Sequence, residues 1–137
     1  MKSLNRILHN RFAHIHLAFA LLSSCSHSGN KFNVPGFEHL QWQKDSLACN
    51  GYRYEHYSLL RENKQCLLGS KEVDILDFLG RPNKIVKRSE SISFYYYITR
   101  GEQCLLEGRN ELKLSQNTVI EVLFKDEKVI NVSIQVP

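Results

Sequence analysis

Three segments in the C-terminal half of the chain alternate apolar and other side chains with the two-residue period of a β-strand, and this pattern constrains the fold more than any other feature. The strands are expected at residues 92–98, 118–124 and 129–136. The short charged segment Lys125–Lys128 suits a hairpin connection between the last two. A strand with one apolar face needs cover on that face alone, so the pattern predicts an antiparallel sheet. Residues 105–117 are expected to form a loop or a frayed strand extension.

Two helices are expected before these strands. The first runs from a cap at Asp45 to about Glu62, with apolar residues at imperfect helical spacing. The second is capped at Ser70, carries Asp74 in its positive first turn and ends at Gly80. The order helix, helix, strand, strand, strand predicts an α+β domain. In it, two N-terminal helices pack on one face of a three-stranded antiparallel sheet, an ααβββ arrangement that follows a signal peptide.

The first 25 residues have the layout of a secretory signal. Lys2, Arg6 and Arg11 supply early positive charge, an apolar stretch follows at 12–22, and small residues precede Cys25. The apolar stretch is shorter than the roughly 20 residues that span a bilayer as a helix. We therefore expect cleavage rather than a permanent membrane span. The alternative is a short core helix with a chance cysteine, which the segment's three histidines disfavour because they would bury poorly.

The end of this segment, Leu22-Ser23-Ser24-Cys25, resembles the bacterial lipobox. The resemblance implies cleavage before Cys25 and acylation of both its thiol and its new amine. Several acyl chains would then anchor the protein to a membrane, each buried methylene contributing about 0.8 kcal/mol.

The expected organisation has three parts: a lipoprotein signal peptide at 1–24, the lipidated cysteine and a flexible tether at 25–40, and a single α+β domain at 41–137. Residues after Cys25 include no acidic run of the kind that directs lipoproteins to the outer surface in some bacteria. We therefore expect a domain in the cell envelope that is anchored to the outer membrane and faces the periplasm.

Charge and residue spacing exclude several classes of function. The mature chain would carry 15 basic and 14 acidic residues, which is not the footprint of a nucleic-acid-binding protein. It has no cysteine or histidine pairs at metal-ligand spacing, so no metal and no cofactor is expected. No catalytic motif is present either. An enzyme would need a pocket that gathers Asp45 with His39 or His56.

Further residues carry a resemblance to a known family over residues 67–136. These are the run Leu68-Gly69-Ser70-Lys71-Glu72-Val73, the turn Leu79-Gly80-Arg81-Pro82, a Tyr-rich strand and a final hairpin. Together they resemble the SmpA/OmlA-type (BamE-like) small outer-membrane lipoproteins. The upstream pattern Trp42-x-x-Asp45-x-x-x-Cys49-x-Gly51-x-Arg53, with Gln103-Cys104, is similar to a variant in uncharacterised bacterial lipoproteins. The resemblance implies this fold and a role in envelope assembly or maintenance, although the architecture serves assembly factors and inhibitors alike. The extra cysteines and the different first helix depart from the assembly-factor pattern.

With Cys25 lipidated, three cysteines remain in the oxidising compartment outside the cytoplasm. We expect a disulfide between Cys49 and Cys104, which would join the first helix to the loop after the first strand. Cys66 is then expected to be a reduced, buried thiol.

The aromatic residues supply the candidate contact surface. Tyr96 is expected in the core, whereas Tyr95 and Tyr97 point the opposite way and, with Trp42, are candidates for contact with a protein partner.

Three functions follow from the sequence. The leading one is a membrane-tethered, non-catalytic protein-interaction module with a partner in the envelope. The second is an inhibitor-like or ligand-binding lipoprotein that uses the loop 100–117. The third is an enzyme, which no catalytic motif in the sequence supports.

Overall fold

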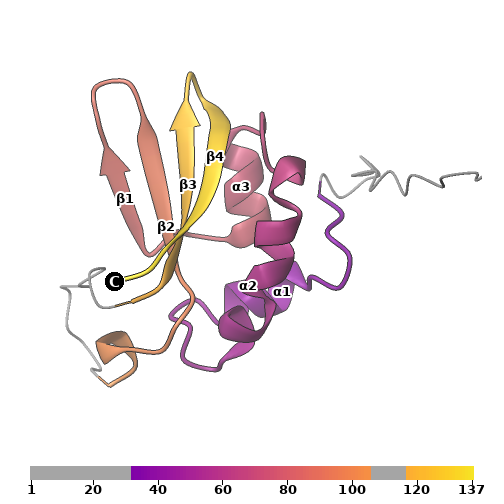
Figure 1. Ribbon diagram of the computed structural model, residues 1–137, viewed down its shortest axis with the longest axis vertical. Helices are drawn as coiled ribbons and strands as arrows, with labels where there is room; N and C mark the ends of the chain where they lie inside the picture. The colour runs from indigo at the N-terminus through magenta and orange to yellow at the C-terminus, as the bar shows by residue number, and fades with distance from the viewer. Residues whose placement is uncertain (1–31, 106–116) are drawn as a thin grey trace, which may run out of the picture.

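The computed structural model describes residues 32–105 and 117–137. Its strands form one antiparallel sheet in which neighbours in sequence are neighbours in space, in the order β1-β2-β3-β4. The helices cover one face of this sheet (Figure 1). The helical elements are α1 (His39–Lys44), α2 (Tyr52–Glu62), η1 (Lys64–Cys66), α3 (Glu72–Leu79) and η2 (Glu102–Cys104), and the strands are β1 (Lys84–Lys87), β2 (Ile92–Tyr97), β3 (Val119–Lys125) and β4 (Lys128–Gln135).

The α+β class is confirmed, but the expected three-stranded sheet is wrong because β1 adds a fourth strand. β1 is only four residues long and has lysine at both ends, so it shows no apolar alternation. Its pairing with β2 places Ile85 beside Phe94, and that register defines it as a strand. The remaining strands lie where their period predicts them.

The expected first helix is also wrong, because the chain turns sharply within it. A separate helix, α1, ends at Lys44, and α2 begins only at Tyr52. Between them, Ala48 and Gly51 have positive φ angles of 57° and 89°, which no helix accommodates. These turns end the first helix before the second can start.

The second predicted helix is present as α3, but its N-cap is Lys71 rather than the expected Ser70. The Asp74 carboxylate accepts a hydrogen bond of 3.0 Å from the Lys71 main-chain N–H at the start of α3. Gly80, with a φ of 77°, ends the helix, and a Cβ there would lie 3.0 Å from the Gln43 side chain. The Gln43 amide itself donates to the main-chain oxygens of Asp77 and Phe78. These contacts hold α1 against the end of α3.

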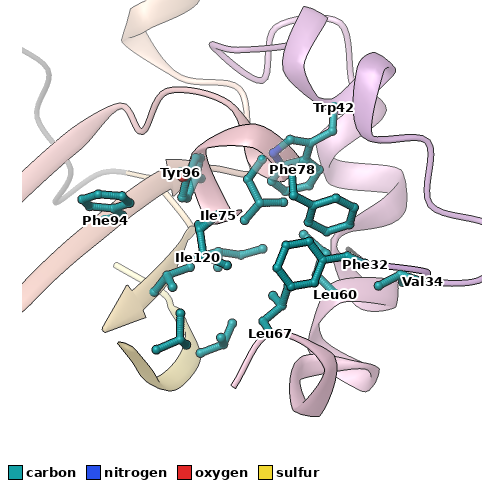
Figure 2. Packing of buried hydrophobic residues seen from close by; sticks show 14 of the residues in the cluster. Phe32, Val34, Trp42, Leu60, Leu67, Ile75, Phe78, Phe94, Tyr96 and Ile120 are labelled. Carbon is teal, nitrogen blue, oxygen red and sulfur yellow. The ribbon is translucent and has the colours of Figure 1, made fainter. Parts of the chain in front are cut away.

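One apolar core fills the space between the helices and the sheet (Figure 2). Phe94 and Tyr96 of β2 point into it, and Ile120 and Val122 of β3 lie on the same face. Its buried members are Phe32, Val34, Phe37, Trp42, Leu60, Leu67, Ile75, Phe78, Leu79, Phe94, Tyr96, Ile98, Ile120, Val122, Phe124, Val129 and Val132.

The folded domain begins before the expected boundary at residue 41. The Phe32 ring lies 4.8 Å from that of Phe78, and the Phe37 ring lies 5.4 Å from that of Trp42. The segment from Phe32 onward is therefore part of the core. Only residues 26–31 remain between Cys25 and the domain, which makes the expected tether much shorter.

Within the described ranges, no helix has the length and apolar character that crossing a bilayer demands.

Replacing Phe32 by alanine tests this boundary. We expect the Phe32→Ala variant to lose about 3 kcal/mol of unfolding free energy, because a ring packed on Phe78 is replaced by a void. Urea denaturation would measure the loss. Leu40→Ala, which truncates a side chain that is 58% exposed on α1, is the matched control and should change stability by less than about 1 kcal/mol. Equal stability of wild type and Phe32→Ala would restore the later boundary.

Candidate interaction surface

The sequence pattern that includes Trp42, Asp45 and Arg53 forms a buried junction. The Arg53 side chain is 1% exposed and lies where α1, α2 and the sheet meet. Its Nε donates to the Trp42 main-chain oxygen at 3.1 Å. Its Nη1 donates to Asn83 Oδ1 at 3.2 Å and to the Tyr97 main-chain oxygen at 3.4 Å. One guanidinium group therefore joins two helices to the start of the sheet.

The charge of Arg53 is stabilised by Asp45, by aromatic faces and by the oxygens that accept its hydrogen bonds. Its guanidinium carbon lies 4.7 Å from the centroid of the Trp42 ring and 5.8 Å from that of Tyr96, which are cation–π distances. Burial lowers the pKa of Arg53 to about 10, and the charge of Asp45 opposes that shift. Burial also raises the pKa of Tyr96, so its phenol stays neutral beside the cation.

Asp45 shapes the turn that precedes α2. Its carboxylate is buried and accepts main-chain N–H bonds from Asn50 at 2.8 Å and from Arg53 at 3.1 Å. The bond from Arg53 satisfies a donor in the first turn of α2 that has no partner within the helix, and the bond from Asn50 holds the turn before it. The role of Asp45 in the described residues is therefore to cap a helix.

Asn83 completes the junction, although nothing in the sequence singled it out. Its Oδ1 accepts from the Tyr97 N–H at 2.8 Å, and its Nδ2 donates to the Ser46 oxygen at 2.8 Å. It follows α3 directly, where the chain turns into β1, so its amide fixes the helix-to-sheet connection. Its position directly after Gly80-Arg81-Pro82 was the feature of the sequence that could have predicted a role in the turn.

The expected disulfide between Cys49 and Cys104 is confirmed. The two Cα atoms lie 5.6 Å apart, and the bond joins the turn before α2 to η2. Gln103 adds to the same contact because its amide donates to the Leu47 main-chain oxygen at 3.1 Å. A cross-link across 55 residues stabilises by about 4 kcal/mol in the entropic description.

The expectation of a reduced Cys66 is wrong. Its side chain is buried at the end of η1 and is disulfide-bonded, as are all the cysteines in the described part of the chain. While this disulfide is intact, Cys66 has no free thiol that could act as a nucleophile or a metal ligand.

The structure does not present Trp42, Tyr95 and Tyr97 to a partner, so their expected exposure is wrong. Trp42 lies in the main core. Tyr95 and Tyr97 belong to a second buried cluster with Ala48 and Val119. Their side chains point away from Tyr96, as the alternation predicts, but the turn that carries Ala48 covers them.

The face of the sheet that points away from the helices carries a polar network next to this cluster. The Tyr95 hydroxyl donates to Glu121 at 2.7 Å, and Glu121 also accepts from Ser133 and Gln135. Neutral donors thus hold the carboxylate of Glu121 across three strands.

The residues that an enzyme would have needed make separate contacts. His39 stacks on Phe78 with ring centroids 6.0 Å apart, and His56 stacks on Tyr52 at 4.0 Å. Asp45 is engaged by the main chain as described above. Among the described residues, no three histidine, cysteine, aspartate or glutamate side chains gather in a way that could hold a metal ion.

A shallow groove of about 350 Å³ lies between the tips of the β1–β2 and β3–β4 hairpins and the start of α3. Lys125 forms an ion pair with Glu90 at 3.6 Å across it. Its lining mixes both signs of charge: Lys87, Arg88 and Lys125 with Glu72, Glu90, Asp126 and Glu127. The groove therefore selects no single charge.

The edge of the sheet is different, because positive charge follows β1 from end to end. Arg81, Lys84, Lys87 and Arg88 are all exposed and lie within eight residues that contain no acidic side chain. We call these four residues the basic edge. The sequence analysis missed it because it weighed the total charge of the mature chain, which is nearly neutral. The spacing of the four residues along 81–88 was the signal.

Comparison with known proteins gives no relative. No family model, no curated protein and no solved structure matches the chain.

The Arg53 junction can be tested by replacing its charge with an apolar chain of similar length. Arg53→Met removes the Arg53 donor to the main-chain oxygens of Trp42 and Tyr97 and one of the two donors to Asn83 Oδ1, so we expect a loss of about 2–4 kcal/mol in unfolding free energy. Chemical denaturation would measure it. Arg61→Met, at an exposed arginine of the same helix, should cost less than about 0.5 kcal/mol. Equal effects of the two substitutions would argue against the junction.

The hydroxyl of Tyr97 gives a prediction of the opposite sign. It is buried and has no hydrogen-bond partner among the described residues, so Tyr97→Phe should preserve or raise stability at neutral pH. Burial raises the pKa of Tyr97 above its unfolded value of 10.0. The folded state therefore keeps its proton longer than the unfolded state, and stability falls as pH rises above that value.

Urea unfolding at neutral pH and at about pH 10.5 would show a smaller alkaline loss in Tyr97→Phe than in wild type. Tyr95→Phe is the control, because it removes a hydroxyl that is bonded to Glu121 and should lower stability by about 1 kcal/mol. A large neutral-pH loss in Tyr97→Phe would mean that its hydroxyl has a partner.

Proposed function

We propose that this protein is a lipid-anchored, non-catalytic protein-interaction module of the bacterial cell envelope. In this proposal Cys25 carries the lipid, and the domain from Phe32 onward faces the periplasm from the outer membrane. Its role is to hold a protein partner near that membrane, in envelope assembly or maintenance.

The disulfide between Cys49 and Cys104 is the observation that carries the proposal. Such bonds persist in oxidising compartments outside the cytoplasm and are rare within it. A disulfide of this kind favours an exported chain, and the first 25 residues have the layout of an export signal. The lipobox-like end of that signal then supplies the anchor.

The early start of the domain supports a role close to the membrane. Only residues 26–31 separate Cys25 from the core, and fully extended chain covers at most about 25 Å over that distance. A domain on so short a connection stays at the surface of the bilayer. Its partner would have to be a neighbour at the same membrane.

The burial of the motif residues supports binding over catalysis. Trp42, Asp45 and Arg53 are engaged with one another and with the main chain, so the most conspicuous pattern of the sequence serves the fold. The chemistry left on the surface is charge and main-chain hydrogen bonding. The sequence motifs that resemble SmpA/OmlA-type lipoproteins, together with the order of helices ahead of an antiparallel sheet, support an envelope role.

The inhibitor-like or ligand-binding alternative depends on the loop 100–117. Residues 106–116 of that loop lie outside the described residues. No contact of the described part favours this alternative over the first.

The sulfur of Cys25 is the decisive atom. Cys49 and Cys104 pair with each other, and Cys66 is disulfide-bonded in a chain that has four cysteines. A sulfur that forms a thioether to lipid cannot also form a disulfide. Acylation of Cys25 therefore excludes a disulfide between Cys25 and Cys66, and the acylated and disulfide-bonded forms differ in mass.

Replacing Cys25 by serine tests the anchor. We expect wild type in the membrane fraction, with acyl label and an intact mass that shows cleavage before Cys25. The Cys25→Ser variant should leave that fraction and lose the label, because no acceptor thiol remains.

Cys66→Ser is the matched control and should stay anchored. A wild-type protein that carries no lipid, or a Cys25→Ser variant that stays in the membrane fraction unchanged, contradicts the proposal. A mass that instead shows Cys25 disulfide-bonded to Cys66 would replace the anchor with a second cross-link.

A further inference from the structure

The strand β1 is an edge of the sheet and pairs, in the described part of the chain, with β2 alone. Figure 1 shows it on the side of the sheet that lies farthest from the helices. Three of its four residues are exposed, and the Ile85 side chain is 49% exposed. An edge strand of this kind presents main-chain donors and acceptors on which another strand can form.

The register shows which main-chain groups face outward. The Arg88 N–H donates to the Ser91 oxygen at 2.8 Å, which makes these two residues a hydrogen-bonded pair at the hairpin end. Bonded pairs alternate along an antiparallel ladder, so Val86 also faces β2. The N–H and C=O groups of Ile85 and Lys87 therefore point away from the sheet.

The basic edge determines what can occupy this strand. Arg81, Lys84, Lys87 and Arg88 flank the outward-facing groups along the chain and are exposed, and the Arg88 guanidinium also donates to Ser93 Oγ at 2.9 Å. The acids near it gather at the hairpin end, where Glu72, Glu90, Asp126 and Glu127 line the groove with Lys87 and Arg88, and Glu90 pairs with Lys125. Glu121 lies two strands away and accepts bonds from neutral donors. A second copy of the chain would bring four more cations against these four, and the repulsion disfavours it. An acidic segment has the complementary charge.

The position of β1 favours a protein partner over a membrane surface. Figure 1 shows the first described residues, which follow the proposed anchor, on the opposite side of the molecule from β1. With so short a connection to the bilayer, the side that holds Phe32 is the one kept near lipid. The basic edge is then directed toward the aqueous compartment.

We propose that β1 binds an extended, acidic segment of a partner protein, which adds to the sheet as a fifth strand. Main-chain bonds to Ile85 and Lys87 supply the strand geometry, and the basic edge selects the acidic side chains. Ile85 packs against an apolar residue that alternates with them. The inference rests on the proposed function in two respects: the domain acts by binding, and the anchor keeps the Phe32 side near lipid.

The test uses the purified full protein in nonionic detergent and a fluorescent peptide of about eight residues in which glutamate alternates with valine. We expect saturable binding by anisotropy, weakened by added salt. The same peptide with alternate main-chain nitrogens methylated should bind about tenfold or more weakly, because it cannot form the outward ladder. This comparison needs no variant of the protein to fold.

Two variants separate strand addition from attraction by charge. Ile85→Pro keeps all four cations and the pairing with β2 but removes an outward N–H, which edge strands tolerate. It should bind the peptide about tenfold or more weakly than Ile85→Val. Lys84→Glu with Lys87→Glu should do the same, whereas Lys125→Glu with Lys128→Glu, an equal change of charge on the other hairpin, should have little effect.

Binding of the protein to vesicles that contain phosphatidylglycerol is measured as well, to test a membrane surface as the alternative partner. Binding to these vesicles without binding to the peptide overturns the proposal and assigns the basic edge to lipid. Peptide binding that is equal in Ile85→Pro and Ile85→Val, or indifferent to methylation of the peptide, also overturns it, because charge alone would then suffice. None of these outcomes depends on whether Cys25 is acylated, so failure here leaves the anchor proposal as it stands.

Discussion

The buried charge of Arg53 is the constraint on which the arrangement of helices and sheet depends. A guanidinium cannot leave water without donors satisfied and charge balanced, and here the requirement is met by groups from several elements at once. The oxygen of Trp42 comes from α1, the amide of Asn83 from the turn into β1, and the oxygen of Tyr97 from β2. All of these elements must therefore be in place before the guanidinium has all of its hydrogen-bond partners. Packing of apolar surface alone would allow the helices more than one position on the sheet, whereas a charge with fixed partners allows few.

Much of the fold could be predicted from the chain because its signals are local. The two-residue period identified β2, β3 and β4, and Asp74 and Gly80 marked the two ends of α3. The failures have non-local causes. The expected first helix was interrupted because the Asp45 carboxylate captures donors that lie further along the chain, a bond that no periodicity shows. The strand β1 has too few residues to display a period, and it exists because β2 offers it a partner. The contribution of Phe32 to the core depends on Phe78, which is distant in sequence.

The candidate surface was harder to predict than the fold. Alternation correctly placed Tyr95 and Tyr97 on the face opposite Tyr96, but it could not show that a turn held by a disulfide would cover that face. A contact surface was therefore expected where a second small core exists. The basic edge was not predicted, although its four cationic residues can be read in the sequence. Their importance for binding depends on β1 being an open edge of the sheet, which only the structure shows. The pairing of Cys49 with Cys104 was expected because the proposed lipidation of Cys25 would leave three cysteines, which limited the choices.

The position of the cross-link also bears on how the chain assembles. Both Cys49 and Cys104 precede β3, and the elements between them include α2, α3 and the β1–β2 hairpin, whereas α1 precedes Cys49. A chain that crosses a membrane with its N-terminus first can thus be oxidised before its last two strands have emerged. The β3–β4 hairpin then arrives at a ready-made template, the bare flank of β2, and joins by simple lateral addition without threading through the covalent ring. In a chain exported as proposed, oxidation and completion of the sheet would be separate events in time, ordered by the direction of export.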